Sequence, residues 1–274
     1  MKKILLCNDD GISAPGLKAI YQQLKEWAEV KVIAPEIQRS GESKSLTFNK
    51  PIRMYEVDLG DGKEGYTITG TAADAVIFGL NQLKKDRPFD LVVSGINAGE
   101  NTSCHSILTS GTCAAAFEAS FFDVPAVAFS LDVEDEFLFH NQLDEKAFET
   151  AAKLANKMIQ KISNQTFPKN MAFLNVNFPA KVTEKTPIRI TTLARTKYTN
   201  FPIARNDPQG KEYFWLWGDY IEELPEGSDS KVVLKDHEIS ITPIEINLAL
   251  KEPKMLEELM EQMKKITEEK ISTQ

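Results

Sequence analysis

MKKILLCNDDGI, residues 1–12, is an apolar run that ends on two adjacent carboxylates, Asp9 and Asp10. A short apolar run of this kind predicts a buried strand. Two neighbouring carboxylates repel each other unless a cation lies between them. Mg²⁺ is commonly held by one or two carboxylates, with water and phosphate oxygens as its other ligands. The stretch therefore suits a divalent metal site at a strand end, although Asp-Asp-Gly is also a common turn sequence.

The next segments predict a βαβ unit. Apolar residues recur at the spacing of one helix face at Leu17, Ile20, Leu24 and Trp27. Residues 30–35 (VKVIAP) then predict a second strand. Such crossovers are right-handed and leave the two strands parallel, so both strands end at the same edge of the sheet. We therefore expect the polar loop at 36–45 (EIQRSGESKS) to open beside the aspartate pair.

A third strand and a helix start point to the same place. Residues 88–94 (PFDLVVS) predict a buried strand, which runs into the polar segment 95–101 (GINAGEN). If this strand is parallel as well, its loop joins the crevice where open α/β sheets bind ligands. Farther along, 109–112 (TSGT) precedes a strong helix former at 113–119 (CAAAFEA). The N-terminus of that helix can bind an anion, although an ordinary Ser or Thr N-cap is the commoner role.

Composition limits the class of protein. A chain of 274 residues with 42% hydrophobic content can bury a large core. The 32 Lys and Arg residues against 40 Asp and Glu residues give a net charge of −8, which argues against a nucleic-acid polymer or an anionic membrane as partner. The first apolar run is too short for a signal peptide or a membrane helix, so we expect a cytoplasmic protein. Three cysteines lack metal or redox spacing and are interpreted as buried or incidental thiols: Cys7, Cys104 and Cys113.

The expected fold is α/β: a three-layer sandwich with a mainly parallel sheet, a Rossmann-like N-terminal part and a β-rich C-terminal extension with a protruding hairpin and a terminal helix. We expect one domain over 1–274, in which 1–135 holds the Rossmann-like core and the active site. The rest, 136–274, completes the sheet. Its expected elements are a helix at 148–162, strands at 171–177 and 188–193, a hairpin at about 195–220 and a C-terminal helix at about 253–271. The aromatic arm at 211–217 (KEYFWLW) is either a subunit contact or packed on its own domain.

Several motifs occur together along nearly the whole chain. They are NDDGI with APG in 8–16, RSG with two serines, Leu and Thr in 39–47, Gly70-Thr71 with Asp74, SGINAG at 94–99, Asp207-Pro208 with Gly210, Tyr213 and Trp215, GSD at 227–229 and SITP at 240–243. This set resembles the SurE, or survival protein E, family of metal-dependent 5′/3′-nucleotidases. The resemblance implies a phosphomonoesterase of the 5′-nucleotidase type that hydrolyses nucleoside 5′-monophosphates to nucleoside and phosphate, with 3′-monophosphates as further candidate substrates. It also implies a homodimer or homotetramer.

The resemblance further implies a site. One divalent ion per subunit, Mg²⁺ or Mn²⁺, is expected on Asp9, Asp10, Ser40 and Asn97. The two aspartates are also the expected catalytic residues, with Asp9 orienting or deprotonating the attacking water. The expected substrate-binding residues are Gly41, Ser43, Asn101, Ser110, Gly111 and Thr112. The sequence departs from the usual family pattern at Ala72, Ser103 and Thr109.

Other classes compete with this interpretation. A signalling receiver also pairs acidic residues after its first strand, but it needs a phospho-accepting Asp where this chain has the segment 94–97 (SGIN). A Ca²⁺-dependent nucleoside hydrolase also uses an N-terminal acidic cluster, and a structural stress protein would show no turnover. Of the three histidines, His105, His140 and His237, only His105 lies near the expected site. We assign it no catalytic role, because no partner that would orient it is evident for it or for a Cys104-His105 pair.

Overall fold

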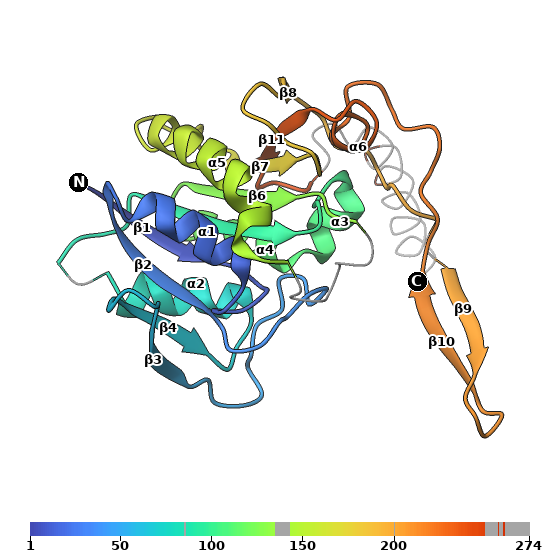
Figure 1. Ribbon diagram of the computed structural model, residues 1–274, viewed down its shortest axis with the longest axis horizontal. Helices are drawn as coiled ribbons and strands as arrows, with labels where there is room; N and C mark the ends of the chain where they lie inside the picture. Colours follow the sequence, from blue (N-terminus) through green and yellow to red (C-terminus); the bar gives the residue numbers. More distant parts are fainter. Residues whose placement is uncertain (85, 135–142, 200, 250–256, 258–259, 261–274) are drawn as a thin grey trace, which may run out of the picture.

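The computed structural model describes residues 1–84, 86–134, 143–199, 201–249, 257 and 260. Its centre is a sheet with the strand order β3-β4-β2-β1-β5-β6-β7-β11-β8 (Figure 1). In chain order, these strands are β1 (Lys2–Cys7), β2 (Ala28–Pro35), β3 (Met54–Asp58), β4 (Glu64–Ile68), β5 (Leu91–Ala98), β6 (Ala126–Leu131), β7 (Met171–Phe178), β8 (Ile188–Ile190) and β11 (Ile239–Glu245). The sheet thus takes strands from both halves of the chain.

The predicted βαβ unit is present. Strand β1 lies between β2 and β5 and is parallel to both, with Leu6 opposite Val32 and Val93. Helix α1 (Pro15–Leu24) connects β1 to β2. It packs so closely on β5 that a Cβ at Gly16 would lie 1.9 Å from the carbonyl oxygen of Ile96. The apolar residues at helical spacing therefore bury one face of α1 against the strand that follows the expected site.

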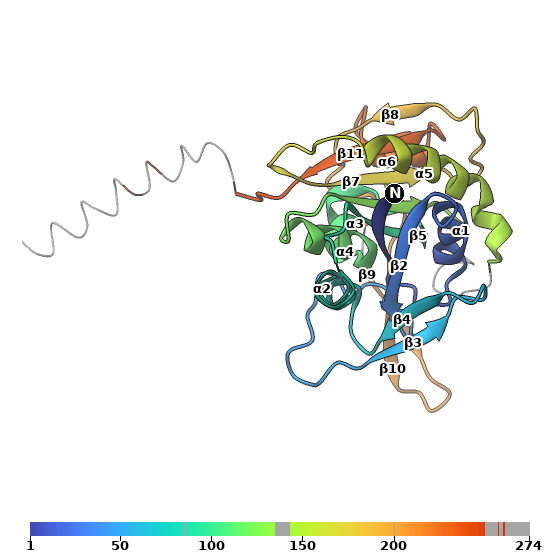
Figure 2. The ribbon, with the colours of Figure 1, turned by 90° about the vertical axis from the view of Figure 1, so that its left-hand side faces the viewer.

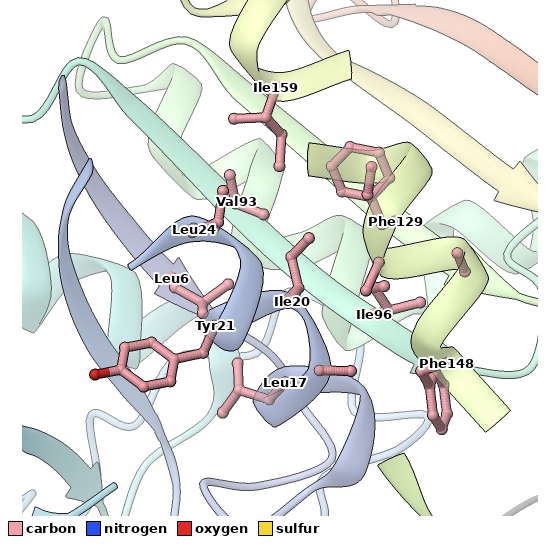
Figure 3. Packing of buried hydrophobic residues seen from close by; sticks show 14 of the residues in the cluster. Leu6, Leu17, Ile20, Tyr21, Leu24, Val93, Ile96, Phe129, Phe148 and Ile159 are labelled. Carbon is pink, nitrogen blue, oxygen red and sulfur yellow. The ribbon is translucent and has the colours of Figure 1, made fainter. Parts of the chain in front are cut away.

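Helices cover both faces of the sheet, as expected for a three-layer α/β sandwich (Figure 2). Alternate residues of β1 point to opposite faces: Ile4 and Leu6 belong to one apolar cluster, and Leu5 and Cys7 belong to the other. The first cluster lies under α1 and α5 (Glu149–Ile162), and Figure 3 shows part of it. The second cluster lies under α2 (Ala72–Gln82) and α4 (Gly111–Ser120). This packing on both faces fixes the carboxyl ends of β1 and β5, where the polar loops begin.

Two elements differ from the sequence expectations. The edge of the sheet beyond β2 is an antiparallel pair of strands, β3 and β4, which the sequence pattern does not predict. Most of β3 is exposed, so its residues lack the apolar pattern of a buried strand. The expected polar tract before α4 contains a helix, α3 (Ser103–Thr109), of which only Ser103 and Ile107 are buried. A helix with so few buried residues gives little periodic signal.

The predicted hairpin is present as a separate two-stranded sheet of β9 (Phe201–Asn206) and β10 (Glu212–Trp217), which pair antiparallel. It projects away from the body of the molecule (Figure 1). Every residue of β10 is exposed, so within the described part of the chain the aromatic arm does not pack on its own domain. A short helix, α6 (Asp229–Leu234), follows the hairpin and packs beside β11.

Apart from residues 257 and 260, the C-terminal helix expected at about 253–271 lies outside the described residues, as does His140. Among the residues that are described, no helix is both long enough and apolar enough to cross a membrane.

Candidate active site

The turn after β1 holds both aspartates. Asn8 closes the turn on Gly11, because its Nδ2 donates to the Gly11 carbonyl oxygen over 3.1 Å and its Oδ1 accepts from the Gly11 N–H over 3.2 Å. Gly11 has a φ of +100°, a conformation that glycine adopts without strain. Asp9 and Asp10 lie inside this turn and are only 3% and 6% exposed. The turn that Asn8 closes on Gly11 therefore positions both carboxylates.

Burial makes the charged form of both aspartates unfavourable. Loss of hydration raises the pKa of Asp9 to about 6, although hydrogen bonds from Thr112 and from the N–H groups of Asp9 and Gly111 oppose the rise. Loss of hydration and the neighbouring charge of Asp9 together raise the pKa of Asp10 to about 7. A cation between the two carboxylates would reverse both effects. The pair is thus electrostatically suited to a divalent ion.

The loop after β2 brings Ser40 to this turn, as its position at the same sheet edge predicts. The Arg39 N–H donates to the Asp9 carbonyl oxygen over 2.7 Å. The side chain of Gln38 joins two expected metal ligands, because its Nε2 donates to Asp10 Oδ1 over 3.2 Å and to Ser40 Oγ over 3.0 Å. Sequence reasoning did not single out Gln38, since one glutamine in a polar loop carries no recognisable pattern.

The fourth expected ligand, Asn97, lies near the end of β5. Its Nδ2 donates to the Gly99 carbonyl oxygen over 2.6 Å and to that of Ala98 over 3.3 Å. Its Oδ1 makes no hydrogen bond with the described residues and remains available as a neutral oxygen ligand. In the described ranges, no group of three or more His, Cys, Asp or Glu side chains could hold a metal ion. Two carboxylates with Ser40 and Asn97 form a different but chemically suitable set, because Mg²⁺ and similar hard cations prefer oxygen ligands of mixed charge.

Helix α4 begins against Asp9. Ser110 is its N-cap, and the Ser110 Oγ accepts from the Cys113 N–H over 3.1 Å. The Thr112 hydroxyl, also in the first turn, donates to Asp9 Oδ1. The helix N-terminus, where we expected a phosphate, therefore already receives the carboxylate of Asp9. Gly111 does not have a positive φ, so the reason for glycine at this position is space rather than backbone conformation.

A cavity of about 200 Å³ opens over this site. It is lined by six of the residues that the sequence analysis selected: Asp9, Ser40, Gly41, Asn97, Asn101 and Ser110. The others do not line it. Asp10 contacts two lining residues, because its carboxylate accepts from the Gln38 side chain and from the Ala98 N–H. Ser43 donates its N–H to the Thr109 carbonyl oxygen over 3.1 Å. Gly111 and Thr112 pack against Asp9.

Besides Gln38, the lining residues that were not selected from the sequence include Glu100, Lys197 and Tyr198. The ammonium group of Lys197 forms an ion pair with the Glu100 carboxylate and also donates to the Glu100 carbonyl oxygen over 3.2 Å. Both side chains are buried. The two residues are 97 positions apart, and Lys197 lies in a segment without helix or strand periodicity, so no local signal indicated this pair.

The motif Gly70-Thr71 with Asp74 has a structural role. Thr71 and Asp74 form a capping box at the start of α2: the Thr71 side chain accepts from the Asp74 N–H, and Asp74 Oδ2 accepts from the Thr71 N–H over 3.0 Å. The same carboxylate accepts the Thr47 hydroxyl over 2.7 Å. The motif thus anchors the end of the loop that carries Ser40.

The candidate nucleophiles and bases outside the carboxylate pair do not line the cavity. Cys104 and His105 are exposed on α3, and neither is among the lining residues. Burial raises the pKa of the Cys7 and Cys113 thiols to about 12, which leaves both protonated at neutral pH. These findings agree with the absence of any assigned role for Cys104 and His105.

An open, mainly parallel sheet with carboxylate, hydroxyl and amide oxygens gathered at the carboxyl ends of its strands defines an α/β protein with a ligand site at that edge. The family model of survival protein SurE matches residues 4–200. This chain belongs to the SurE family.

The relatives extend the match over almost the full length. A 5′-nucleotidase SurE from Methanothrix thermoacetophila is 40% identical over 253 residues, which cover 92% of this chain and 95% of the relative. Another from Methanocaldococcus jannaschii is 40% identical over 268 residues, which cover 96% and 98%. The crystal structure of the SurE protein from Aquifex aeolicus has a TM-score of 0.77 and 32% identity, and the match covers 93% of this chain and 99% of that one. The fold and the family expected from the motifs are thereby confirmed.

Proposed function

We propose that this chain, a phosphomonoesterase, hydrolyses nucleoside 5′-monophosphates in the cavity at the carboxyl ends of β1 and β5, with one divalent ion per subunit on Asp9, Asp10, Ser40 and Asn97. The ion is Mg²⁺ or Mn²⁺, and 3′-monophosphates are further candidate substrates. The class of reaction agrees with the relatives, which carry the name 5′-nucleotidase SurE. The ligand set and the roles below are our proposal.

One observation carries it. Asp9, Ser40 and Asn97 come from three separate segments, the turn after β1, the loop after β2 and the end of β5, yet they line a single cavity. Asp10 is joined to this set by the Gln38 amide, which bridges it to Ser40. A divalent ion held by these oxygens supplies Lewis-acid chemistry, since it polarises a phosphoryl oxygen and lowers the pKa of a bound water.

The chain's own groups account for the remaining tasks. Asp9 orients or deprotonates the attacking water, and its carboxylate is itself oriented by the Thr112 hydroxyl. Ser110 lies at the cavity wall and is the residue of the α4 N-terminus that can donate to a phosphate oxygen. Gly41 and Asn101 line the same cavity and restrict where the ester can lie. Tight positioning of this kind provides much of the rate in phosphoryl transfer.

Two alternatives make different products. A receiver domain would form an acyl phosphate on an aspartate, but the strand that should carry one, β5, ends in the segment 94–98 (SGINA). Labelling with acetyl phosphate would detect such a group. A nucleoside hydrolase would release a free base, which chromatography of the products distinguishes from a nucleoside.

The decisive experiment is phosphate release from a panel of 5′- and 3′-mononucleotides with Mg²⁺, Mn²⁺ or EDTA. We expect turnover of the 5′-monophosphates with either ion and none with EDTA. Release of base without phosphate, or no release from any mononucleotide at saturating metal, would contradict the proposal.

The proposal includes a homodimer or homotetramer in the cytoplasm, without a nucleic-acid polymer or membrane as partner. Its support is the hairpin arm β10, whose aromatic side chains are exposed. The hairpin itself projects from the body of the molecule (Figure 1). An exposed cluster of large apolar side chains typically marks an interaction surface.

A further inference from the structure

Lys197 is distinctive among the residues of the cavity. Asp9 and Glu100 are the acidic side chains that line it, and Lys197 is the only cationic one among the described lining residues. Its side chain is 2% exposed and that of Glu100 is 5% exposed. A buried lysine needs an anionic partner, and here Glu100 supplies it. The pair therefore places one positive charge in a wall that is otherwise neutral or acidic.

The backbone around Lys197 is held firmly to the N-terminal part of the site. The Cys104 N–H donates to the Ala194 carbonyl oxygen over 2.8 Å. The fully buried carboxylate of Asp229 accepts from the Ser103 N–H over 2.7 Å and from the Ala194 N–H over 3.0 Å. A chain segment from the second half is thus attached to the start of α3, and Lys197 follows three residues after this attachment.

Ser103 shows how constrained this junction is. It has a φ of +75°, in the left-handed region that is strained for a non-glycine residue. Its N–H nevertheless points to Asp229, and its own hydroxyl accepts from the Ser106 N–H over 3.3 Å. The hydrogen bond to Asp229 is formed with Ser103 in this strained conformation. The position of the segment that carries Lys197 is therefore strongly determined.

From this geometry we propose that Lys197 binds the phosphate group of the substrate, and that Glu100 holds the ammonium group until a phosphate ester enters. The inference rests on the proposed function for the identity of the ligand. A phosphate monoester is a dianion at neutral pH, whereas the Glu100 carboxylate carries one negative charge, so the phosphate competes effectively for the lysine. The second half of the chain thereby contributes a substrate-binding residue to a site whose expected metal ligands all come from the first half.

Glu100 then opposes binding, and this distinguishes the proposal from a purely structural ion pair. Replacing Glu100 by Gln removes a negative charge beside the incoming phosphate and frees the lysine, so phosphate should bind more tightly. Replacing Lys197 by Met removes the attractive charge and leaves Glu100 uncompensated, so phosphate should bind more weakly. If the pair served only to stabilise the fold, the two replacements would act in the same direction.

The test uses the full chain and inorganic phosphate as the probe, with affinity measured by calorimetry at saturating Mn²⁺ and constant ionic strength. Hydrogen bonds to charged groups contribute about 1.5–3 kcal/mol, which corresponds to a change of about 10- to 100-fold in the dissociation constant. We expect Lys197→Met to weaken phosphate binding by about this factor. We expect Glu100→Gln to tighten it several-fold, and Lys197→Arg to keep it within several-fold of the unmodified chain.

In the single Lys197→Met variant, the unpaired Glu100 carboxylate also repels phosphate. The double variant Glu100→Gln, Lys197→Met lacks this carboxylate, so its comparison with Glu100→Gln isolates the effect of Lys197. In the Glu100→Gln background, Lys197→Met should still weaken phosphate binding by about 10-fold or more, and this comparison also serves if the single Lys197→Met variant does not fold. Lys3→Met is the matched control: Lys3 is equally buried, at the opposite end of β1, where its Nζ donates to the Arg87 carbonyl oxygen over 3.1 Å. This control should leave phosphate affinity unchanged.

Equal weakening by Lys197→Met and Glu100→Gln, with a double variant no weaker than either, would overturn the inference. Hydrolysis of mononucleotides is measured separately. If the affinities change as expected but no mononucleotide is hydrolysed, the proposed function fails and the phosphate site stands. If hydrolysis is normal and phosphate affinity is unchanged in Lys197→Met, the inference fails and the proposed function stands.

Discussion

Gly111 lies so close to Asp9 that a Cβ at position 111 would be 2.5 Å from Asp9 Cβ and 2.6 Å from Asp9 Oδ2. Both distances are shorter than atoms in proteins tolerate, so a side chain at Gly111 must displace the carboxylate or the start of α4. This contact holds Asp9 between β1 and the helix N-terminus. It also explains why the helix begins with a glycine, which is otherwise a weak helix former.

Gly111→Ala, and more strongly Gly111→Val, should therefore damage activity more than stability. A displacement of about 1 Å at a catalytic group can cost roughly 100-fold in rate, and we expect at least that loss in kcat/KM. Overpacking typically costs about 1–3 kcal/mol of stability, which thermal unfolding would measure. The control is Gly79→Ala, whose Cβ would meet the Leu5 methyl groups at 2.7 Å in the core. It should lower the Tm and spare kcat/KM, whereas wild-type activity in Gly111→Ala would refute the role of this contact.

Metal removal should abolish turnover. The site has two buried carboxylates and, apart from Lys197, no cationic side chain among its described lining residues, so an added ion must supply the charge for phosphoryl transfer. We expect no activity after dialysis against EDTA and recovery with Mn²⁺ or Mg²⁺. The Tm should rise with the concentration of the ion, because binding to the folded state alone stabilises it. Undiminished turnover in thoroughly metal-stripped protein would contradict this expectation.

Asp10→Asn should separate stability from activity. Burial and the charge of Asp9 raise the pKa of Asp10 to about 7, from a value near 4 in the unfolded chain. The folded metal-free protein thus binds a proton that the unfolded chain releases, and the resulting stability is present below about pH 4 and lost as the pH rises to about 7. At pH 8, metal-free Asp10→Asn should unfold at a higher temperature than the unmodified protein, while it loses most turnover with metal. An unchanged or lower Tm at pH 8 would show that repulsion between the carboxylates is not significant.

His105→Ala should leave the rate within about an order of magnitude. A general acid or base typically contributes roughly 10²–10⁴-fold, and His105 is exposed on α3 rather than in the cavity wall. Steady-state kinetics at several pH values would detect a larger role. A loss of 100-fold or more, together with an active Gly111→Val, would move the centre of the site to the Cys104-His105 segment.

Trp215→Glu should reduce the size of the assembly. Trp215 is 63% exposed on β10, and a charge there would oppose burial of the hairpin against another subunit. Light scattering coupled to size exclusion would measure the molar mass. Ile190→Glu is a suitable control, because Ile190 is 84% exposed on the edge strand β8, far along the sheet order from the active site. An unchanged mass for Trp215→Glu would exclude Trp215 as a subunit contact.

The sequence alone indicated most of the central fold and the edge at which the site lies. The apolar run before Asp9 and the helical spacing after it follow from burial, and the right-handed crossover then makes β1 and β2 parallel. The same rule brought Ser40 and Asn97 to the edge that holds Asp9. The edge strand β3 was not predictable in this way, since its mostly exposed residues show no regular apolar pattern.

Only the tertiary structure decided which groups meet at that edge. The Gln38 amide joins Asp10 to Ser40, and Lys197 reaches Glu100 from 97 residues away. Sequence periodicity reports which residues are buried and in which element, because burial follows local repeats of 2 or 3.6 residues. It carries no information on partners brought together by packing. The sequence therefore determined where in the fold the site lies. The packing of distant segments determined which charged groups meet there.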